Sequence, residues 1–505
     1  MTVIKKITKA IFNKYYRSVE DFIDRSSSVQ EENLSYLLEH GRNTLIGSEY
    51  NFDKIDGISE FQKRVPVFRY EDLRPYLDKI IIDKKSNVLW DTPIRWFAMS
   101  SGTTNDKSKY IPVTRESLVN CHYRCGRQML GLYTNQYPDS SFVFGKTLVI
   151  GGSQQVNNIG DGIFTGDISA VLMKNLPFLI KLARTPEALA MIPDWEKKLE
   201  QLSLYARKED VRALLGVPSW MLVLLKKIVS DTGHSIPELW KNIEVFFHGG
   251  VSFSPYHEQY EEIIPTGNMR YWETYNASEG FFGVQFSEKS KDMLLMLNNE
   301  IFYEFIPDSE WKENNPKTVV LSEVEVGKQY AMVITTSGGL WRYEIGDTIE
   351  FTSTNPYLFR ITGRTKQFIN AFGEELIVDN TDRAIERACS ITNSKILEYT
   401  VAPVYFGNDS SGAHEWYIEF EKEPNSIESF TAILDESLKS LNSDYEAKRS
   451  YNLSLGMPIV RVLKPGDFYK WMEHRKKIGG QNKVPKLSNN RNYVDDISSF
   501  LNEKY

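Results

Sequence analysis

Apolar residues follow a different spacing in three successive parts of the chain. Up to about residue 90 the spacing is helical, for example in residues 33–38, where Gly41 follows as a stop signal. From there to about residue 280, short apolar runs that favour buried strands alternate with helical segments. From Met293 the apolar positions repeat every second residue, which favours antiparallel strands, and residues 298–300 are a candidate hairpin turn.

In the middle part, the predicted strands end in glycine or small polar residues. These strands cover residues 94–99, 146–150, 243–247 and 269–275, and we expect a helix after the last of them. Alternation of strand, glycine and helix predicts an α/β fold. Ligands of such sheets bind at the carboxyl ends of the strands, where this sequence places Gly249, Gly250, Ser278 and Glu279.

A change of pattern after the predicted strand at residues 358–364 indicates a domain boundary. The following residues predict a small α+β unit with strands at 398–403, 415–420 and 459–463 and a helix from 426 to about 441. We therefore predict a large N-terminal α/β domain with an antiparallel β portion, residues 1–364, and a small, mobile α+β C-terminal domain, residues 365–505. Residues 479–486 are glycine-rich and basic, which predicts a mobile loop.

Composition narrows the class of protein. The chain has 505 residues, 41% hydrophobic and 25% charged, which is typical of a globular protein with more than one domain. The net charge of -7 argues against nucleic acid as the main partner, because phosphate backbones bind basic faces. The N-terminal segment is broken by lysines, and the most apolar run, residues 220–225, is too short to span a bilayer. We expect a cytoplasmic protein that binds no membrane.

The cysteines do not indicate a disulfide framework or a zinc site. Only three are present, and Cys121 and Cys125 lie in a predicted helix from residue 115 to about residue 133. No second pair accompanies them, although a structural zinc needs four ligands. We interpret them as ordinary helix residues.

The stretch from Ser100 to Lys109 is the strongest candidate for chemistry. It has four hydroxyls and a glycine in five residues, followed by Lys107 and Lys109, between two predicted strands. Backbone amides, hydroxyls and a lysine together suit a polyphosphate. The spacing is not that of a P-loop, which needs a second glycine directly before a Lys-Ser/Thr pair and a helix. The alternative is a polar surface hairpin. The candidate phosphate-binding residues are Ser100, Ser101, Gly102, Thr103, Thr104 and Lys109.

Four separated stretches occur in the order and approximate spacing of adenylate-forming enzymes: residues 100–109, 275–279, 343–347 and 363–366. More narrowly, the chain resembles the Gretchen Hagen-type acyl-acid amido synthetases, the auxin- and jasmonate-conjugating family of plants with bacterial relatives. The resemblance covers nearly the whole chain. It implies activation of a carboxylic acid by ATP as an acyl-adenylate, transfer of the acyl group to the amine of an amino acid, and rotation of a small C-terminal domain between the two steps.

The resemblance also implies roles for individual residues. The hydroxyl loop would hold the β- and γ-phosphates, and Glu279 would bind magnesium (Mg2+), which usually takes one or two carboxylates plus phosphate oxygens. Asp347 would accept hydrogen bonds from both ribose hydroxyls, and Arg364 would add a ribose or phosphate contact. Without the resemblance, Glu279 could be a solvated residue at a helix start, and Asp347 a turn residue. The remaining implied nucleotide contacts are Tyr275, Asn276 and Ser278.

Two lysines complete the site that the resemblance implies. Lys483 would be the catalytic lysine, reaching the α-phosphate from the loop near the C-terminus and stabilising the charge that develops there. Lys366 would be the hinge between the domains. The alternative for Lys483 is an ordinary surface lysine.

The sequence departs from the family pattern at three positions. Asp106 replaces a loop glycine, Glu344 replaces an arginine common in plant members, and Lys486 replaces the arginine after Pro485. These departures are compatible with ATP use but do not support plant-hormone specificity. Two other functions remain open, an acid–coenzyme A ligase and a nucleotide-binding protein without turnover. We place the acid pocket within about residues 120–240.

Overall fold

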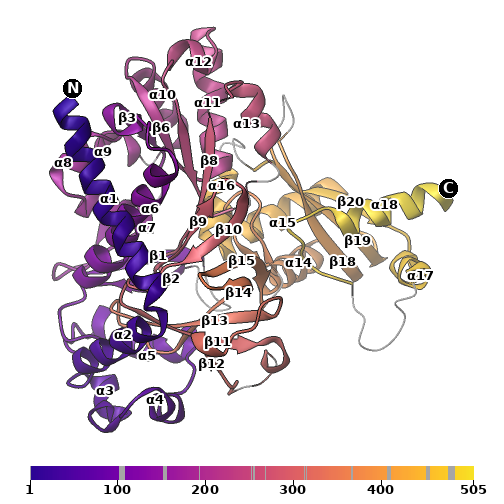
Figure 1. Cartoon of the computed structure of the whole chain (residues 1–505). Coiled ribbons are helices and arrows are strands. Elements are labelled where there is room, and N and C mark those ends of the chain that lie inside the picture. Colours follow the sequence, from indigo (N-terminus) through magenta and orange to yellow (C-terminus); the bar gives the residue numbers. More distant parts are fainter. Residues whose placement is uncertain are drawn as a thin grey trace.

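The chain folds into a large body and a smaller domain that projects from it and ends at the C-terminus (Figure 1). The computed structural model describes residues 2–101, 108–151, 156–192, 194–251, 253, 256–267, 269–311, 313, 315–365, 368–406, 411–450, 455–475 and 484–504. Within these residues, no helix combines the length and apolar character needed to cross a lipid bilayer.

The first part of the chain is helical, as predicted, and it packs on the large body. Gln30 and Asn33 of α2 donate side-chain hydrogen bonds of 2.7–3.2 Å to the carbonyl oxygens of Leu297 and Ile301. These contacts explain why two polar residues of a helix are buried. The helices are α1 (Thr2–Asp24), α2 (Ser26–Gly41), α3 (Leu45–Glu49), α4 (Ile58–Arg64) and α5 (Tyr70–Ile81).

One sheet of eleven described strands forms the core of the large body. Its strand order is β12-β11-β13-β14-β15-β10-β9-β8-β7-β6-β3. The strands are β3 (Lys146–Val149), β6 (Val211–Gly216), β7 (Val245–His248), β8 (Arg270–Asn276), β9 (Phe281–Ser287), β10 (Ser290–Leu295), β11 (Ile301–Pro307), β12 (Val319–Val320), β13 (Gln329–Thr336), β14 (Tyr343–Thr354) and β15 (Tyr357–Arg364).

The direction of the strands changes where the apolar spacing changes. Strands β3, β6, β7 and β8 are parallel, whereas the pairs from β8 to β12 are antiparallel. The predicted α/β class with an antiparallel portion is confirmed, and both portions share one sheet. The helices of this region are α7 (Ile168–Asn175), α8 (Phe178–Leu182), α9 (Glu187–Ala190), α10 (Trp195–Ala206), α11 (Pro218–Thr232), α12 (Ile236–Leu239) and α13 (His257–Ile263).

Two local predictions are wrong. Residues 298–300 do not form a hairpin turn, because β13, β14 and β15 separate β10 from β11 in the sheet. The carbonyl oxygens of Leu297 and Ile301, on either side of this segment, accept hydrogen bonds from Asn33 of α2. The segment after β8 is followed by β9 rather than by a helix, so Glu279 does not lie at a helix start.

A second described sheet, of order β2-β1-β5-β4, carries the hydroxyl-rich stretch. Strands β1 (Trp96–Ser101) and β2 (Ser108–Val113) are antiparallel, with Ser100 opposite Lys109. Residues 102–107, between these two strands in the sequence, lie outside the described residues. The short strands β4 (Asn157–Asn158) and β5 (Phe164–Gly166) complete this sheet.

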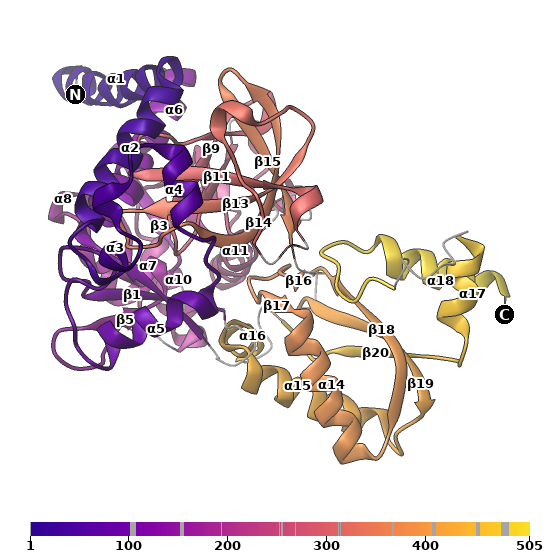
Figure 2. The same cartoon turned by 90° about the horizontal axis from the view of Figure 1, so that it is seen from below.

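The small domain has its own core around a three-stranded sheet of order β18-β19-β20. Its described elements are β16 (Phe368–Ile369), β17 (Leu376–Ile377), α14 (Val378–Thr392), β18 (Lys395–Val404), β19 (Ala413–Lys422), α15 (Ile427–Leu441), α16 (Ser443–Arg449), β20 (Ile459–Leu463), α17 (Asp467–His474) and α18 (Asn492–Lys504). Figure 2 shows this domain beside the large body, with α16 turned toward it.

The small domain touches the large body through α11 and α13. Trp220 donates a hydrogen bond from its indole nitrogen to the carbonyl oxygen of Phe372, at 3.2 Å. Tyr256 donates its hydroxyl to the carbonyl oxygen of Ala371, at 2.5 Å. The ammonium group of Lys448 lies 3.7 Å from the centre of the Trp220 ring. Strand β15 ends at Arg364, and the residues of the small domain that make these contacts come after it; the domain boundary at this point stays a prediction.

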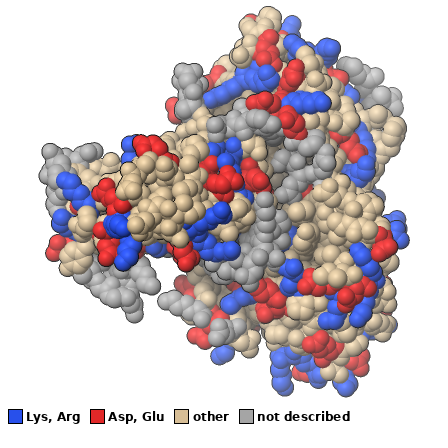
Figure 3. All heavy atoms as spheres, turned by 180° about the vertical axis from the view of Figure 1, so that it is seen from behind, with Lys and Arg blue, Asp and Glu red and all other residues tan. Residues whose placement is uncertain are grey.

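The outer surface carries charge of both signs. On the face in Figure 3, acidic and basic side chains are interspersed over both domains. Among its described residues, this face shows no extended basic patch.

Candidate active site

A cavity of about 1150 Å³ lies at the carboxyl ends of the parallel strands, between the β1–β2 hairpin and the small domain. This is the position at which α/β sheets bind ligands. The sequence-predicted residues that line it are Ser100, Lys109, Gly249, Gly250, Tyr275, Asn276, Ser278, Glu279, Asp347 and Arg364. The other predicted site residues are outside the part of the chain whose side chains the structure describes: Ser101, Gly102, Thr103, Thr104, Lys366 and Lys483.

Asp347 is the centre of a hydrogen-bond network on the cavity wall. It lies on β14 directly opposite Arg364 of β15, whose Nε donates to Asp347 Oδ1 at 2.6 Å. The hydroxyl of Tyr275 donates to the other carboxylate oxygen. Burial and the Asp347 carboxylate raise the pKa of Tyr275, so its hydroxyl stays protonated. Each carboxylate oxygen has two lone pairs, so Asp347 keeps capacity for two further donors.

Glu375 is a member of this network that the sequence did not indicate. Arg364 forms a second ion pair with it. Burial alone would lower the pKa of Arg364, but the carboxylates of Asp347 and Glu375 outweigh this effect and raise it. Because Glu375 belongs to the small domain and Asp347 to the large body, Arg364 joins the two domains electrostatically.

Glu279 lies in the turn between β8 and β9, which the hydrogen bond from Ala277 N–H to the Gly280 carbonyl oxygen closes at 2.9 Å. Burial raises its carboxyl pKa to about 7, and the nearby Lys109 opposes this shift. Such a carboxylate is stabilised when a cation enters the cavity. No group of three or more acidic, histidine or cysteine residues arranged for a metal occurs in the described chain. One carboxylate together with phosphate oxygens is nevertheless a usual environment for Mg2+.

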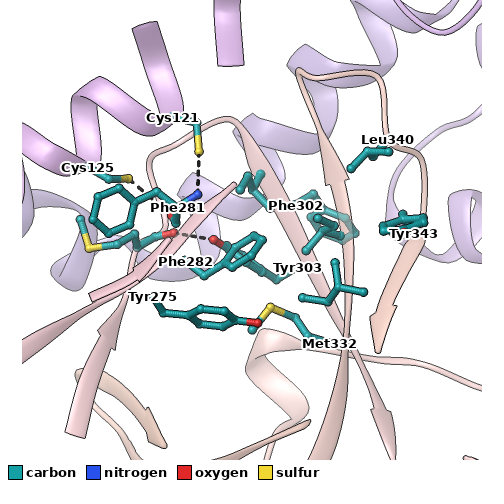
Figure 4. Close-up of a cluster of buried hydrophobic side chains, with 14 of the residues drawn as sticks. Cys121, Cys125, Tyr275, Phe281, Phe282, Phe302, Tyr303, Met332, Leu340 and Tyr343 are labelled. Carbon is teal, nitrogen blue, oxygen red and sulfur yellow. Dashed lines mark hydrogen bonds between the residues drawn. The ribbon is translucent and has the colours of Figure 1, made fainter. Parts of the chain in front are cut away.

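The two cysteines hold the start of β9, next to the turn that carries Glu279. Cys121 Sγ accepts a hydrogen bond from the Phe281 N–H at 3.3 Å, and Cys125 donates its thiol to the Phe281 carbonyl oxygen at 3.6 Å. Figure 4 shows both sulfur atoms directed at this residue from the helix side. Both sulfur atoms therefore have a hydrogen-bond partner in the backbone of Phe281. The helix is irregular here: Ser117–His122 form a π-helix before α6 (Tyr123–Gln136).

His122, within the π-helix, positions Asn276 on the cavity wall. Its Nδ1 lies 2.9 Å from the amide oxygen of Asn276. Burial lowers the pKa of His122 to about 4, so the ring is neutral at pH 7 and Nδ1 donates its proton to the amide oxygen. The Asn276 NH2 group is then left for other partners. No sequence signal identified His122, because its role depends on a contact across 154 residues.

The glycine pair after β7 has a packing explanation. A Cβ atom on Gly249 would lie 2.3 Å from the carbonyl oxygen of Thr274, so only glycine lets β7 end this close to β8. Gly250 has a φ of +86°, which favours glycine. Its carbonyl oxygen accepts a hydrogen bond of 3.2 Å from Asn370 of the small domain. A nucleotide contact at either glycine stays a prediction.

Because two histidines are buried, we predict that the folded protein loses stability in acid. Burial lowers the pKa of His122 to about 4 and that of His248 to about 3, from an ordinary 6.5. Between pH 6.5 and these values the unfolded chain binds more protons than the folded chain. The free energy of unfolding should therefore decrease, by about 1.4 kcal/mol per histidine and pH unit, as pH falls. In a His248→Phe variant, which keeps a ring against Phe253, urea titrations at pH 7 and 5 should show a clearly smaller decrease. An unchanged decrease would contradict the assignment.

Comparison with known proteins places these features in a family. The family model for the GH3 family N-terminal domain matches residues 15–269. The models for the GH3 family central domain and C-terminal domain match residues 294–364 and 379–492.

Curated relatives match over almost their whole length. The jasmonoyl–L-amino acid synthetase JAR4 of Nicotiana attenuata is 24% identical, over 100% of this chain and 98% of its own length. The indole-3-acetic acid-amido synthetase GH3.4 of Arabidopsis thaliana is 23% identical, over 94% of this chain and 91% of its own length.

Two solved structures have the same fold. The GH3.15 acyl acid amido synthetase superposes with a TM-score of 0.60 at 20% identity, covering 95% of this chain and 94% of its own. A 2-hydroxyisobutyryl-CoA ligase, bound to its acyl-adenylate and coenzyme A, superposes with a TM-score of 0.55 at 16% identity, covering 95% of this chain and 92% of its own.

Proposed function

Since the chain belongs to the GH3 family, we propose that it is an ATP-dependent ligase that activates a carboxylic acid as an acyl-adenylate and joins the acyl group to the amine of an amino acid. The observation that carries this proposal is the cavity at the carboxyl ends of the parallel strands, which Tyr275, Glu279, Asp347 and Lys109 all line. Relatives that are named amido synthetases and match nearly the whole chain support it.

ATP binds, in this proposal, along the wall from β14 to the β1–β2 hairpin. The two ribose hydroxyls donate to the remaining lone pairs of Asp347. The β- and γ-phosphates lie at the hairpin, where Ser100 and Lys109 line the cavity. Glu279 would hold Mg2+, which neutralises charge on the departing pyrophosphate. Gly249, Gly250, Asn276 and Ser278 line the space between these two ends.

The chemistry has two balanced steps. The acid carboxylate forms a bond to the α-phosphorus while the bond to pyrophosphate breaks. The amine then forms a bond to the acyl carbon, loses a proton, and expels AMP. We propose that Lys483 stabilises the negative charge on the α-phosphate during the first step.

The second step requires the small domain to move, and we propose that Lys366 is the hinge. The contacts of Trp220 with Phe372 and Lys448, and of Tyr256 with Ala371, hold the present arrangement. Rotation would exchange them for others. Because these bonds involve backbone carbonyl groups and a single cation–π contact, water can replace their partners during the motion.

The acceptor distinguishes this proposal from its main alternative. A coenzyme A ligase shares the fold, and the fold alone does not select an amine over a thiol. The relatives that cover the chain in sequence are named for amino acid conjugation, and this observation favours an amine. We place the enzyme in the cytoplasm, where ATP and amino acids are available, with no role for nucleic acid or membrane.

ATP–pyrophosphate exchange tests the proposal. With Mg2+ and a panel of acids that includes hexanoate, adipate, benzoate and isophthalate, together with plant-hormone acids and hydroxy acids, labelled pyrophosphate should enter ATP only when an accepted acid is present. Added amino acids should then give an amide and AMP, and coenzyme A should not replace them. Absence of exchange with every acid would contradict the proposed function, and thioester formation would favour the alternative.

A further inference from the structure

Arg184 lines the same cavity at a place that the proposed chemistry does not use. It lies just after α8, and backbone hydrogen bonds fix the residues on both sides of it to β3. The Thr147 N–H donates to the carbonyl oxygen of Ala183 at 2.9 Å, and the Thr185 N–H donates to that of Thr147 at 3.1 Å. The hydroxyl oxygen of Thr185 also accepts from the Val149 N–H at 2.8 Å. The arginine is therefore presented to the cavity from a rigid backbone.

Its guanidinium group has no carboxylate partner among the described residues. Arg184 is half-buried, and three other arginines with little exposed surface are paired with carboxylates. Arg342 lies 2.8 Å from Glu304, Arg364 lies 2.6 Å from Asp347, and Arg449 pairs with Asp435. Removing part of a guanidinium group from water is costly unless an anion faces it.

The surroundings of Arg184 also favour an anionic ligand, rather than a protein side chain, as its partner. The neighbouring cavity wall is apolar, with Val149, Leu172, Met173 and Leu215. The group that interacts with the charge of Arg184 is the phenol of Tyr123, whose hydroxyl donates to the Leu172 carbonyl oxygen at 2.9 Å. Burial raises the pKa of this phenol, so it stays neutral and does not balance the charge. Burial also lowers the pKa of Arg184 itself.

Asp167, the acidic residue on the same wall, exerts no charge effect on Arg184, although its Oδ2 has no hydrogen-bond partner among the described residues. Asp167 begins α7 and accepts the Ala170 N–H at 2.8 Å through Oδ1. Its charge acts on Lys198 and Lys448. Arg184 therefore remains, in the described part of the cavity, a fixed cation in an apolar wall.

We propose that Arg184 binds a substrate carboxylate that survives the reaction, a role that rests on the proposed function. The reacting carboxylate becomes an anhydride and then an amide, and it loses its charge. A permanent carboxylate can come from two sources: a second acidic group on the acid, or the α-carboxylate of the amino acid. The planar guanidinium can bind either with two parallel hydrogen bonds. In both cases Arg184 determines which substrate binds at the end of the cavity formed by β3 and α7.

Three matched substrate pairs, of two kinds, separate the sources in one set of variants. The acid pairs are adipate with hexanoate and isophthalate with benzoate, measured by ATP–pyrophosphate exchange. The acceptor pair is L-alanine with L-alaninamide, measured by amide formation with the acid that exchanges fastest. The variants are Arg184→Met, Arg184→Lys and, as the control, Arg360→Met. Arg360 also lines the cavity but is paired with Asp292 and is largely exposed.

Wild-type enzyme should prefer the member with the additional carboxylate in one of the two kinds of pair. Arg184→Met should remove that preference by raising KM about ten- to hundredfold for that member alone. Arg184→Lys should retain part of it, and Arg360→Met all of it. If the preference is lost in the acid pairs, the carboxylate that Arg184 binds belongs to the acid. If it is lost in the acceptor pair, that carboxylate belongs to the amino acid.

Three results would overturn the inference: no preference in either kind of pair, a preference that Arg184→Met leaves intact, or a change in the KM of ATP alone. Each of these results requires that the wild-type enzyme catalyses exchange, so it would leave the proposed function standing. Thermal melting of each variant shows whether it is folded.

Discussion

Replacing Asp347 with alanine should weaken ATP binding by about tenfold or more for each ribose hydrogen bond that is lost. Hydrogen bonds to charged groups contribute about 1.5–3 kcal/mol each, and tenfold in affinity corresponds to about 1.4 kcal/mol. The remaining lone pairs of Asp347 are proposed to accept two such bonds. Arg364 keeps Glu375 as an ion-pair partner in this variant, so the wall should stay folded. Titration calorimetry with ATP and Mg2+ measures the effect.

Tyr275→Phe is the matched control for this prediction. It removes the hydroxyl that donates to the second oxygen of Asp347 but leaves the carboxylate for the ribose. ATP affinity should therefore decrease much less than in Asp347→Ala. Equal affinities in wild type and Asp347→Ala, with both proteins folded, would show that the ribose binds elsewhere.

Replacing Lys483 with alanine should slow adenylate formation about a hundredfold or more. The first step brings a carboxylate toward an anionic phosphate, and a positioned cation offsets that repulsion by on the order of 2–4 kcal/mol. The described cations near the proposed phosphate site have other partners: Arg364 pairs with Asp347 and Glu375, and Lys109 interacts with Glu279. Amide formation from a chemically supplied acyl-adenylate should continue, because it requires no attack on phosphorus.

Lys486→Ala is the control for Lys483. Lys486 forms an ion pair with Glu398, and its ammonium group lies 4.1 Å from the centre of the Tyr399 ring. Its replacement should leave pyrophosphate exchange nearly unchanged. If Lys483→Ala retains full exchange while Lys486→Ala or Lys109→Ala does not, the catalytic lysine has been assigned to the wrong position.

The sequence predicted the fold class because burial sets the apolar spacing. Strand β7 is buried along its length and contains the apolar run Val245–Phe247, whereas the spacing after Met293 is that of antiparallel strands. Strand β6, which contains Arg212, was not among the predicted strands. The sequence did not predict the path from β10 to β11, because Gln30 and Asn33 take up the carbonyl groups of that segment from far away in the chain. We did not predict α14, although its buried residues Ala384, Ile385 and Ala388 have helical spacing.

The sequence predicted those residues of the candidate site that belong to a short local motif. Hydroxyls in a hairpin and acidic residues at strand ends can be recognised in the sequence, and Ser100, Glu279 and Asp347 do line one cavity. Their binding roles stay predictions. His122, Arg184 and Glu375 lie in segments without a recognisable motif. Their places at the cavity depend on tertiary contacts. For Arg184 the informative feature is a missing counter-charge, which only a folded structure can reveal.

The fate of oxygen tests the central claim most directly. The acid that the exchange screen identifies is prepared with a heavy oxygen isotope in its carboxylate and incubated with enzyme, ATP, Mg2+ and the amino acid. If the carboxylate attacks the α-phosphorus, one heavy oxygen stays on that phosphorus when the amine displaces AMP. Mass spectrometry should therefore find one heavy oxygen in AMP for each amide formed, and none in pyrophosphate. Heavy oxygen in inorganic phosphate, with ADP as the nucleotide product, would show activation as an acyl-phosphate and contradict the account.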